Sequence, residues 1–188
     1  MSEEIEVSFL YNDDFISKLD SIGAKLMKTV SLEDSYYEVN DGSCFLTLND
    51  FWLRTRQCNG FKCWQLKYPI KSVNNLCRTH SVKQYYEEED ESKICDKLID
   101  LALQHGKEKY KFDKLDTLAG LLKFSTIGTK RFIYIYEDFE IDLDEADFGY
   151  KVGEIEFKSE KSCTLEEKVQ QVNELASKLG ENYNIKKS

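Results

Sequence analysis

The sequence predicts an α+β fold of one domain over residues 1–188, in which about eight antiparallel strands are interrupted by a few helices. Several segments alternate between apolar and charged side chains, which is the period of a half-buried strand. Asn59-Gly60 separates two such segments and is the strongest short signal for a β-hairpin. Because no internal repeat or linker divides the chain, we expect these strands to belong to one domain, and in this number they could close a barrel.

The first half of the chain is expected to form mainly strands. Residues 3–10 alternate strictly between apolar and polar side chains, as a half-buried strand does. Apolar residues then recur at helical spacing up to Gly23, a typical residue after the end of a helix. The expected elements are, in order, a strand over 3–10, a helix over 13–22, a strand from Lys25 through Tyr37, and hairpin strands over 51–58 and 61–68.

The second half is expected to contain helices as well as strands. Acidic residues favour the N-terminus of a helix, so the acidic run 87–91 predicts a solvated helix start. Thr164 and Glu167 form a capping-box pattern, and Gly180 ends the apolar stripe that follows. The expected elements are a strand over 79–86, a helix from 87 through Leu103, a short helical stretch over 115–122, strands over 124–136, 138–145 and 150–158, and a last helix from Thr164 to Leu179.

The composition limits the class of protein and its partners. With 41% hydrophobic residues, 32% charged residues and one proline, the chain is expected to be globular and to fold alone. A formal net charge of -9 argues against nucleic acids and membrane surfaces as partners, because both are anionic. No apolar run reaches the roughly 18 residues of a membrane-spanning helix. We expect a monomer whose partner is a small molecule.

The cysteines indicate a reducing compartment, and the histidines do not indicate zinc. The six cysteines are irregularly spaced without a CxxC pair, and no apolar signal segment is present at the N-terminus, so we expect free thiols in the cytoplasm. His80 and His105 are the two histidines, and no zinc-like spacing occurs.

A basic set of side chains lies on the expected hairpin. Residues i and i+2 of a strand point to the same side, so Trp52, Arg54 and Arg56 share one face. Lys67 on the partner strand lies in line with Gln65, which brings a third cation toward the arginines. Arginine forks match phosphate oxygens, and we therefore expect these cations to hold a phosphate chain. The alternative is that the arginines form surface ion pairs and that Trp52 belongs to an ordinary core.

Three expected strands carry pairs of carboxylates at the same spacing. The pairs are Glu4 and Glu6, Asp142 and Asp144, and Glu154 and Glu156. Because like charges packed together need a counterion, six carboxylates on three strands predict one or two hard cations, Mg2+ or Mn2+. For each pair taken alone, the alternative is a half-buried strand with a solvated face.

The acidic and basic sets are expected to act together. Helices are expected to cover the apolar faces of the strands, which would leave the charged faces turned toward each other inside a barrel or deep groove. Gly128-Thr-Lys-Arg131 lacks the Walker pattern of a phosphate-binding loop, so Arg131 is predicted as a further cation only. A metal-bound triphosphate would suit both sets of charges.

A series of motifs runs through residues 4 to 156. They are Glu4-Ile-Glu6, Asp34-Ser-Tyr-Tyr37, Phe51-Trp-Leu-Arg-Thr-Arg56, Gln65-Leu-Lys67, Thr129-Lys-Arg131, Ile141-Asp-Leu-Asp144 and Ala146-Asp-Phe-Gly-Tyr-Lys-Val-Gly-Glu-Ile-Glu156. In this order they resemble the motifs of the CYTH superfamily of triphosphate tunnel metalloenzymes. The last motif is the most specific, and it is similar to that of the animal-type thiamine triphosphatases.

The resemblance implies an eight-stranded antiparallel β-barrel, the triphosphate tunnel, with flanking helices. It implies hydrolysis of the terminal phosphate of thiamine triphosphate by water, without a covalent intermediate. The implied catalytic residues are Lys67, Arg54 and Arg56, and the implied substrate-binding residues are Trp52, Arg54, Arg56, Lys67, Arg131 and Asp144. The implied ligands of Mg2+ or Mn2+ are Glu4, Glu6, Asp142, Glu154 and Glu156.

Two departures from the family pattern bear on activity. Ser8 stands where the N-terminal ExExK signature has lysine, and Gln84 stands where the family tends to place an acidic residue. A basic residue that the family supplies from the C-terminus can only be Lys186 or Lys187. The alternatives are therefore an inorganic tripolyphosphatase or nucleoside triphosphatase of the same fold, and a catalytically impaired triphosphate-binding protein. An adenylate cyclase is a further alternative, although nothing in the sequence indicates adenine recognition.

Overall fold

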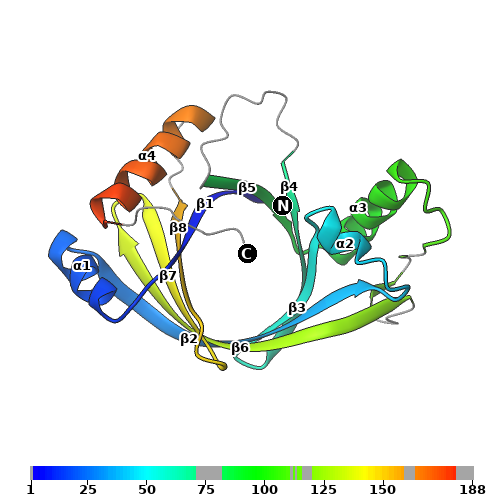
Figure 1. Cartoon of the computed structure of the whole chain (residues 1–188), viewed down its shortest axis with the longest axis horizontal. Helices are drawn as coiled ribbons and strands as arrows, with labels where there is room; N and C mark the ends of the chain where they lie inside the picture. Colours follow the sequence, from blue (N-terminus) through cyan, green and yellow to red (C-terminus); the bar gives the residue numbers. More distant parts are fainter. Residues whose placement is uncertain are drawn as a thin grey trace. The chain divides into compact units, whose positions relative to one another are not determined.

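The computed structural model describes residues 2–70, 82–110, 112, 114, 115, 120–158 and 164–180, and the side chains of residues 2–4, 82, 83 and 165 lie outside this description. Within these residues the chain forms eight strands and four helices (Figure 1). They are, in order, β1 (Ser2–Leu10), α1 (Asp14–Ile22), β2 (Lys25–Val39), α2 (Phe45–Leu48), β3 (Trp52–Cys58), β4 (Phe61–Pro69), β5 (Val82–Glu88), α3 (Glu91–Gln104), β6 (Leu121–Tyr136), β7 (Phe139–Ala146), β8 (Lys151–Phe157) and α4 (Leu165–Lys178).

The strands form one closed barrel. Their order around it is β1-β5-β4-β3-β2-β6-β7-β8. Every pairing whose register is described is antiparallel. The predicted α+β fold, an eight-stranded antiparallel barrel with flanking helices, is therefore confirmed.

Two expectations about the chain as a whole can be compared with the described residues. Cys44, Cys58, Cys63 and Cys95 are free thiols, as predicted, and Cys77 and Cys163 lie outside the described part. No helix in the described part of the chain is long and apolar enough to cross a membrane.

Local sequence signals explain several boundaries. Asn59 and Gly60 both have positive φ, 50° and 82°, as a tight hairpin turn requires, and they join β3 to β4. α1 ends at Gly23 in the left-handed conformation. α4 begins at the predicted capping box, in which the Thr164 hydroxyl accepts a hydrogen bond from the Glu167 amide and the Glu167 carboxylate accepts one from the Thr164 amide.

The prediction of a solvated helix start at 87–91 is wrong for its first two residues. Glu87 and Glu88 lie in β5, and Glu88 is 3% exposed. α3 begins only at Glu91, after Asp90, whose side chain caps it by accepting a backbone hydrogen bond. The acids favour a helix start by propensity, but pairing of β5 with β4 extends the strand to Glu88.

Two further differences concern the other short segments. The helical stretch expected over 115–122 is wrong at its end, because Leu121 and Leu122 begin β6, while residues 116–119 lie outside the described part. The short helix α2 was not predicted. Its first turn is held by the buried carboxylate of Glu38, which accepts hydrogen bonds from the amides of Leu46 and Thr47 at 2.7 and 2.9 Å.

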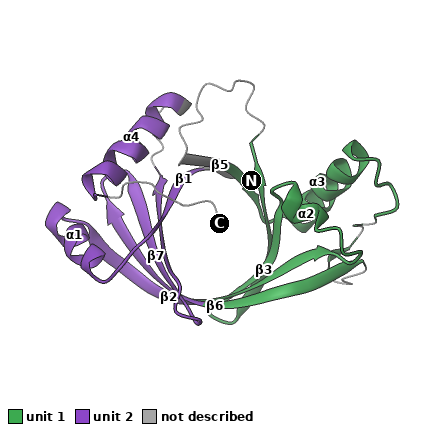
Figure 2. Cartoon of the chain, viewed as in Figure 1, with its two compact units in different colours: residues 1–3, 32–70, 85–128 green, residues 4–31, 71–84, 129–188 purple. Residues whose placement is uncertain are grey.

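The chain divides into two compact units (Figure 2). Unit 1 comprises residues 1–3, 32–70 and 85–128, and unit 2 comprises residues 4–31, 71–84 and 129–188. β1, β2, β5 and β6 contribute residues to both units. Each unit has its own hydrophobic core.

In unit 1, one face of the β3–β4 hairpin packs against α3 (Figure 1). Leu53 of β3 and Leu66 of β4 are directly paired and share a core with Ile94 and Leu98 of α3. All four side chains are at most 1% exposed. Because side chains alternate along a strand, the opposite face of this hairpin is left to the polar residues.

In unit 2, α1 and α4 cover the apolar faces of β1, β7 and β8 (Figure 1). Val7, Ile155 and Ile141 are directly paired across these three strands and are fully buried. Gly153 lies across from Phe9, and a Cβ atom on Gly153 would lie 2.3 Å from the Cζ atom of the Phe9 ring. Glycine is therefore required where this ring crosses β8, and the carboxylates occupy the opposite faces of the strands.

Candidate functional site

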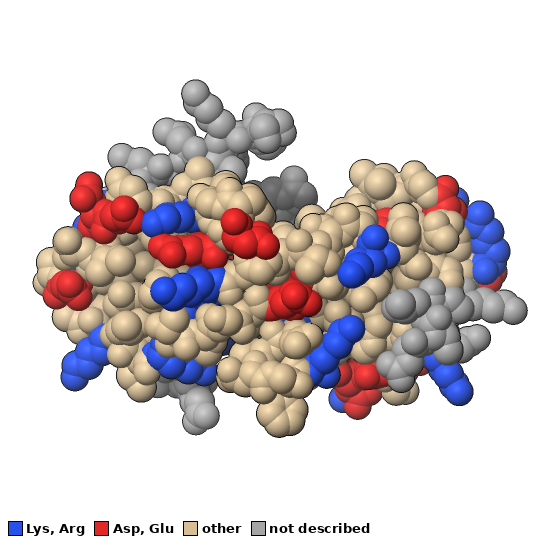
Figure 3. Space-filling model, turned by 90° about the horizontal axis from the view of Figure 1, so that it is seen from below, with Lys and Arg blue, Asp and Glu red and all other residues tan. Residues whose placement is uncertain are grey.

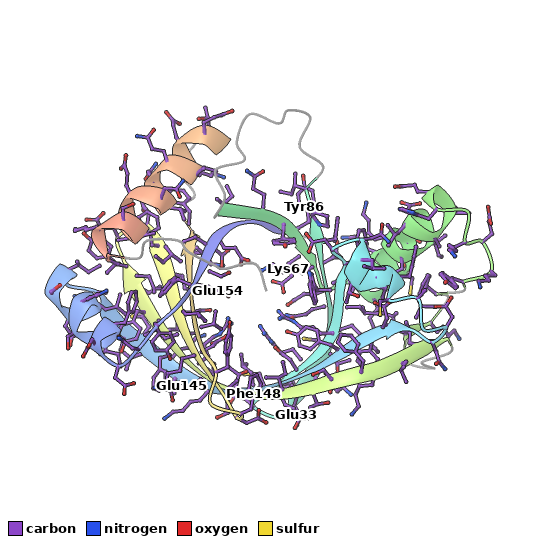
Figure 4. All side chains as sticks on the ribbon, in the orientation of Figure 1. Glu33, Lys67, Tyr86, Glu145, Phe148 and Glu154 are labelled. Carbon is purple, nitrogen blue, oxygen red and sulfur yellow. The ribbon has the colours of Figure 1, made fainter. Side chains whose placement is uncertain are left out.

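The basic side chains of unit 1 lie on the face of β3 and β4 that α3 does not cover. Figure 4 shows Lys67 projecting from β4 on the side away from α3. Carboxylates from both neighbouring strands join this face. Asp34 of β2 lies across from Arg56, and Glu87 of β5 lies across from Lys67. We call the following residues the arginine cluster: Asp34, Arg54, Arg56, Gln65, Lys67 and Glu87.

Arg56 is held by a bidentate contact with Asp34. The Nε atom donates to Oδ1 at 2.8 Å, and Nη2 donates to Oδ2 at 2.6 Å. Asp34 is 5% exposed, so the pair is largely shielded from water. The contact uses one edge of the guanidinium, and the described residues provide no hydrogen-bond partner for Nη1. Arg56 can therefore keep Asp34 and still present N–H donors to an anion.

Arg54 has a contact at each nitrogen of its guanidinium. The Nε atom donates to Oε1 of Gln65 at 2.8 Å, and Nη2 donates to Oε1 of Glu87 at 3.0 Å. The Nη1 atom lies 3.6 Å from Oδ2 of Asp34, which is beyond hydrogen-bond distance, so Asp34 does not occupy its donors. Burial acts to lower the pKa of Arg54, but Tyr36 and the two carboxylates more than offset this effect and raise the pKa. The guanidinium therefore stays charged in a largely buried position.

Trp52 and Lys67 lie across from each other at one end of the hairpin. Lys67 Nζ is 5.0 Å from the centroid of the Tyr85 ring, a cation–π distance. The indole Nε1 of Trp52 donates to Oδ1 of Asp50 at 2.8 Å, and the Tyr85 hydroxyl donates to the same carboxylate. Because Trp52 is 38% exposed, it is not an ordinary core residue: its edge is fixed while part of its ring remains accessible.

The carboxylates of unit 2 lie in rows across β7, β8 and β1. Glu140, Glu156 and Glu6 are directly paired in one row, and Asp142 and Glu154 are paired in the next. Figure 4 shows Glu154 projecting from β8 on the side away from α1 and α4. Glu6 and Asp142 are 5% and 8% exposed, so part of this charge is buried. We call the following residues the acidic cluster: Glu6, Glu140, Asp142, Asp144, Glu154 and Glu156.

Arg131 of β6 is bound by three members of the acidic cluster. The Nε and Nη2 atoms donate to the two oxygens of Asp144, both at 2.7 Å. The Nη1 atom forms an ion pair with Oδ2 of Asp142, and Nη2 lies 3.7 Å from Oε2 of Glu154. Burial acts to lower the pKa of Arg131, but these carboxylates raise it above its ordinary value. Arg131 is thus a charged counterion of the acidic cluster.

The environment of Asp142 disfavours its charged form. Burial raises the pKa of Asp142 to about 7, with Arg131 opposing the shift and the neighbouring acids adding to it. The Oδ1 atom is buried and has no hydrogen-bond partner among the described residues. A buried polar atom without a partner costs free energy, so a cation at this oxygen would be stabilising.

Lys158 neutralises part of the other row. Its Nζ atom lies 2.7 Å from Oε1 of Glu156 and 4.0 Å from Oε1 of Glu140. Burial raises the pKa of Glu156, although the bond from Lys158 opposes the shift. Ser8 of β1 pairs with Glu154 of β8. Lys158 instead follows the last residue of β8 and contacts Glu156.

The donor set fits a hard divalent cation, although the side chains do not converge on one point. No group of three His, Cys, Asp or Glu residues in the described part of the chain is arranged to hold a metal ion. Arg131 and Lys158 engage several of the carboxylates, and Oδ1 of Asp142 remains without a donor. The fit rests on this oxygen and on the direct pairing of carboxylates across the strands. The side chain of Glu4, a predicted ligand, lies outside the described residues.

The predicted site residues fall into both units. Unit 1 holds Trp52, Arg54, Arg56 and Lys67, and unit 2 holds Arg131, Asp144 and the predicted metal ligands. Lys186 and Lys187 lie outside the described residues.

Three carboxylates of the clusters were not predicted as site residues. Glu140 shares the strand face of Asp142, and this spacing alone could have identified it. Asp34 stands in a motif of the family, but its contact with Arg56 depends on the pairing of β2 with β3. The acid of β5 that contacts Arg54 is Glu87. Gln84, at the position where the family tends to have an acidic residue, lies on the same strand.

Elsewhere the charged side chains are mixed in sign. On the face seen in Figure 3, Lys and Arg side chains lie among Asp and Glu side chains. Within unit 2, Lys151 lies 2.7 Å from Oδ1 of Asp13 and 2.9 Å from Oε1 of Glu145. Compared with that face, the acidic cluster is a concentration of one sign of charge.

Comparisons with known proteins agree with this fold. The model of the CYTH domain family matches residues 2–186. Human thiamine-triphosphatase is 28% identical over 186 residues, which cover 94% of this chain and 77% of that protein. Among solved structures, a protein from Pyrococcus horikoshii OT3 is similar with a TM-score of 0.62 at 21% identity, covering 94% of this chain and 90% of that chain. A putative adenylyl cyclase from Hippeastrum with a dominant triphosphatase activity has a TM-score of 0.55 at 19% identity, covering 94% and 88%.

Proposed function

Because the chain belongs to the CYTH domain family, we propose that it is a hydrolase of phosphoanhydrides and that its substrate is thiamine triphosphate. Water attacks the terminal phosphorus, the bond from that phosphorus to the bridging oxygen breaks, and the oxygen keeps the electron pair. The products are inorganic phosphate and thiamine diphosphate. The similarity to thiamine-triphosphatases supports this choice of substrate. We propose further that residues 1–188 form a single CYTH-like domain that acts as a cytoplasmic monomer.

The observation that carries the proposal is the fixed pair of arginines in unit 1. Arg54 and Arg56 are held by buried or half-buried carboxylates, and Nη1 of Arg56 has no partner among the described residues. A preorganised guanidinium binds a phosphate oxygen with little loss of side-chain entropy. Each charge-assisted contact of this kind contributes about 1.5–3 kcal/mol. In this proposal Arg54, Arg56 and Lys67 bind the phosphate chain and stabilise charge that develops during hydrolysis.

The acidic cluster is the proposed place for a divalent metal ion. The residues that would hold Mg2+ or Mn2+ are Glu6, Asp142, Glu154 and Glu156 of this cluster, together with Glu4 of β1. When bound, the ion neutralises phosphoryl oxygens and helps to orient the attacking water. The unpartnered Oδ1 of Asp142 supports this assignment, because a cation would satisfy it.

Trp52 is the proposed contact for the organic part of the substrate. Its indole is fixed by the hydrogen bond to Asp50, and its ring is accessible. A fixed aromatic face binds a cationic heterocycle such as the thiazolium of thiamine by stacking and cation–π attraction. If the protein were an inorganic tripolyphosphatase, Trp52 would have no such role.

Phosphate release from thiamine triphosphate, tripolyphosphate and ATP tests the proposal. Each substrate is assayed with Mg2+, with Mn2+ and with EDTA. We expect metal-dependent release that is fastest with thiamine triphosphate, and Arg56→Ala should raise its KM about tenfold or more. A preference for tripolyphosphate or ATP would instead assign the alternative activity on the same fold.

A second candidate function is triphosphate binding without turnover. It is favoured by Ser8, which pairs with Glu154 where the family signature carries lysine. Ser8→Lys restores that cation, so the substitution should increase phosphate release if the missing charge limits the chemical step. Calorimetry with tripolyphosphate distinguishes the two functions: tight binding by a protein that releases no phosphate would assign the binding role.

A further inference from the structure

The guanidinium of Arg131 is enclosed by carboxylates to a greater extent than that of Arg56. Both arginines use Nε and Nη2 to hold an aspartate side-on. In Arg131, however, Nη1 is also engaged, by Asp142, and Glu154 lies 3.7 Å from Nη2. The side chain of Arg131 is 16% exposed. In this arrangement the edge of Arg131 that could receive a phosphate oxygen already has a partner.

The three acids around Arg131 contact it in different ways. Asp144 makes two hydrogen bonds at 2.7 Å, which is the stronger, bidentate form of the contact. Asp142 contributes one oxygen, and Glu154 is beyond hydrogen-bond distance. Asp142 and Glu154 are direct cross-strand partners and are proposed metal ligands, whereas both oxygens of Asp144 are committed to Arg131.

The negative charges in this group outnumber the positive charge, so a second cation would balance them. Three carboxylates surround one guanidinium, so their formal charges sum to -2 when all three are ionised. The buried Oδ1 of Asp142 has no partner among the described residues. A divalent ion that binds Asp142 and Glu154 would repel the adjacent guanidinium and compete with it for the same carboxylates.

We propose that Arg131 is the resident counterion of the acidic cluster and exchanges partners when a divalent cation binds. Arg131 gives up Asp142 and Glu154, keeps Asp144, and turns its freed Nη1 toward a phosphate oxygen. Asp144 then acts through Arg131 as a positioning residue rather than by touching the substrate, which is reasonable because a carboxylate repels phosphate. This inference rests on the proposed function, since it concerns the metal ion of that reaction.

The exchange couples metal binding to triphosphate binding. An arginine that is released by the metal offers a donor edge that the metal-free protein lacks, so each ligand increases the affinity for the other. For the metal alone, Arg131 is a competitor. Removing its charge should therefore strengthen metal binding in the absence of triphosphate, by about tenfold.

Calorimetric titration with Mn2+ alone, without triphosphate, tests the competition. The proteins compared are the wild type, Arg131→Gln and, as a matched control, Lys151→Gln. Lys151 is a cation of the same unit that contacts Asp13 and Glu145 but not Asp142. We expect the Kd for Mn2+ to fall about tenfold in Arg131→Gln and to change less than about twofold in Lys151→Gln. Equal Kd values in the wild type and Arg131→Gln would overturn the inference, as would equal effects of the two substitutions.

A second measurement uses the wild-type protein and does not depend on the stability of a variant. The Nη1–Hη signal of Arg131, the group that contacts Asp142, is assigned in a nitrogen–proton NMR spectrum by its loss in Arg131→Lys. We expect saturating Mg2+, added without triphosphate, to shift this signal. An unmoved signal while calorimetry shows bound metal would overturn the inference and leave the proposed function standing. Absence of any metal binding to the wild type would overturn both the inference and the proposed role of the acidic cluster.

Discussion

Replacing Asp34 by asparagine tests whether the arginine cluster depends on its buried carboxylate. In the wild type, Asp34 accepts from Nε and Nη2 of Arg56 at 2.8 and 2.6 Å and lies 3.6 Å from Nη1 of Arg54. Asparagine retains one acceptor oxygen and presents an amide N–H in place of the other. One donor of Arg56 then loses its acceptor and faces a second donor, so the bidentate contact cannot form.

The magnitude follows from the contact that is lost. A hydrogen bond to a charged partner contributes about 1.5–3 kcal/mol. If the phosphate chain binds only when this contact holds Arg56 in place, its loss should raise KM about tenfold to about 150-fold. The conversion uses about 1.4 kcal/mol for each factor of ten. The free energy of unfolding should fall by a similar amount, because a half-buried guanidinium is left partly unsatisfied.

The direction of the change in KM distinguishes two roles of Asp34: positioning of Arg56, or only a contribution of negative charge near the site. Removing a negative charge beside a site for a polyanion would lower KM if only long-range electrostatics mattered. Glu33→Gln is the matched control, because Glu33 is exposed, lies next to Asp34 on β2 and also loses one negative charge. KM is measured for tripolyphosphate and thiamine triphosphate, with urea unfolding of each variant. A KM for Asp34→Asn at or below that of Glu33→Gln would refute the positioning role.

Three other substitutions test separate features. Trp52→Ala should raise the KM for thiamine triphosphate about fivefold, the loss of about 1 kcal/mol of aromatic contact, and leave that for tripolyphosphate unchanged in parallel assays. Burial raises the pKa of Tyr11 to about 12, so the neutral hydroxyl is favoured in the folded state. The wild type should therefore lose stability as the pH rises from about 10 through about 12, and Tyr11→Phe should lose less, as measured by urea unfolding across this range. Gly153→Ala should destabilise the protein by about 1–3 kcal/mol through overlap with the Phe9 ring, and a second change of Phe9 to Leu should recover part of that loss in thermal unfolding.

The strand faces could be predicted from sequence because they depend on a period of two and on nothing distant. Arg54 and Arg56 fall on one face of β3, and Asp142 and Asp144 fall on one face of β7, as their spacing requires. The hairpin at Asn59 could also be predicted from local sequence, because its turn needs positive φ at both central residues. These patterns are sufficient for the fold class and for most of the charged side chains of the site.

The partners of those side chains could not be predicted in the same way. Asp34 meets Arg56 because of the register between β2 and β3, which no local pattern specifies. Glu87 has the composition of a helix start, and only its pairing with β4 places it in a strand beside Arg54. For Arg131 the sequence indicates a cation, but its choice of Asp144 and Asp142 follows from the positions of β6 and β7.

The two arginine–aspartate pairs lead to one conclusion about how an acidic protein could bind a polyanion. Arg56 with Asp34 and Arg131 with Asp144 are both direct cross-strand partners, and both use the same edge of the guanidinium. They differ at Nη1, which has no described partner in Arg56 and is held by Asp142 in Arg131. In the proposed function, affinity for phosphate depends on which donor edges are available and not on the net charge of -9. In Arg56, Nη1 would be available to bind a phosphate group at once. In Arg131, Nη1 would become available only after Asp142 has acquired another counterion.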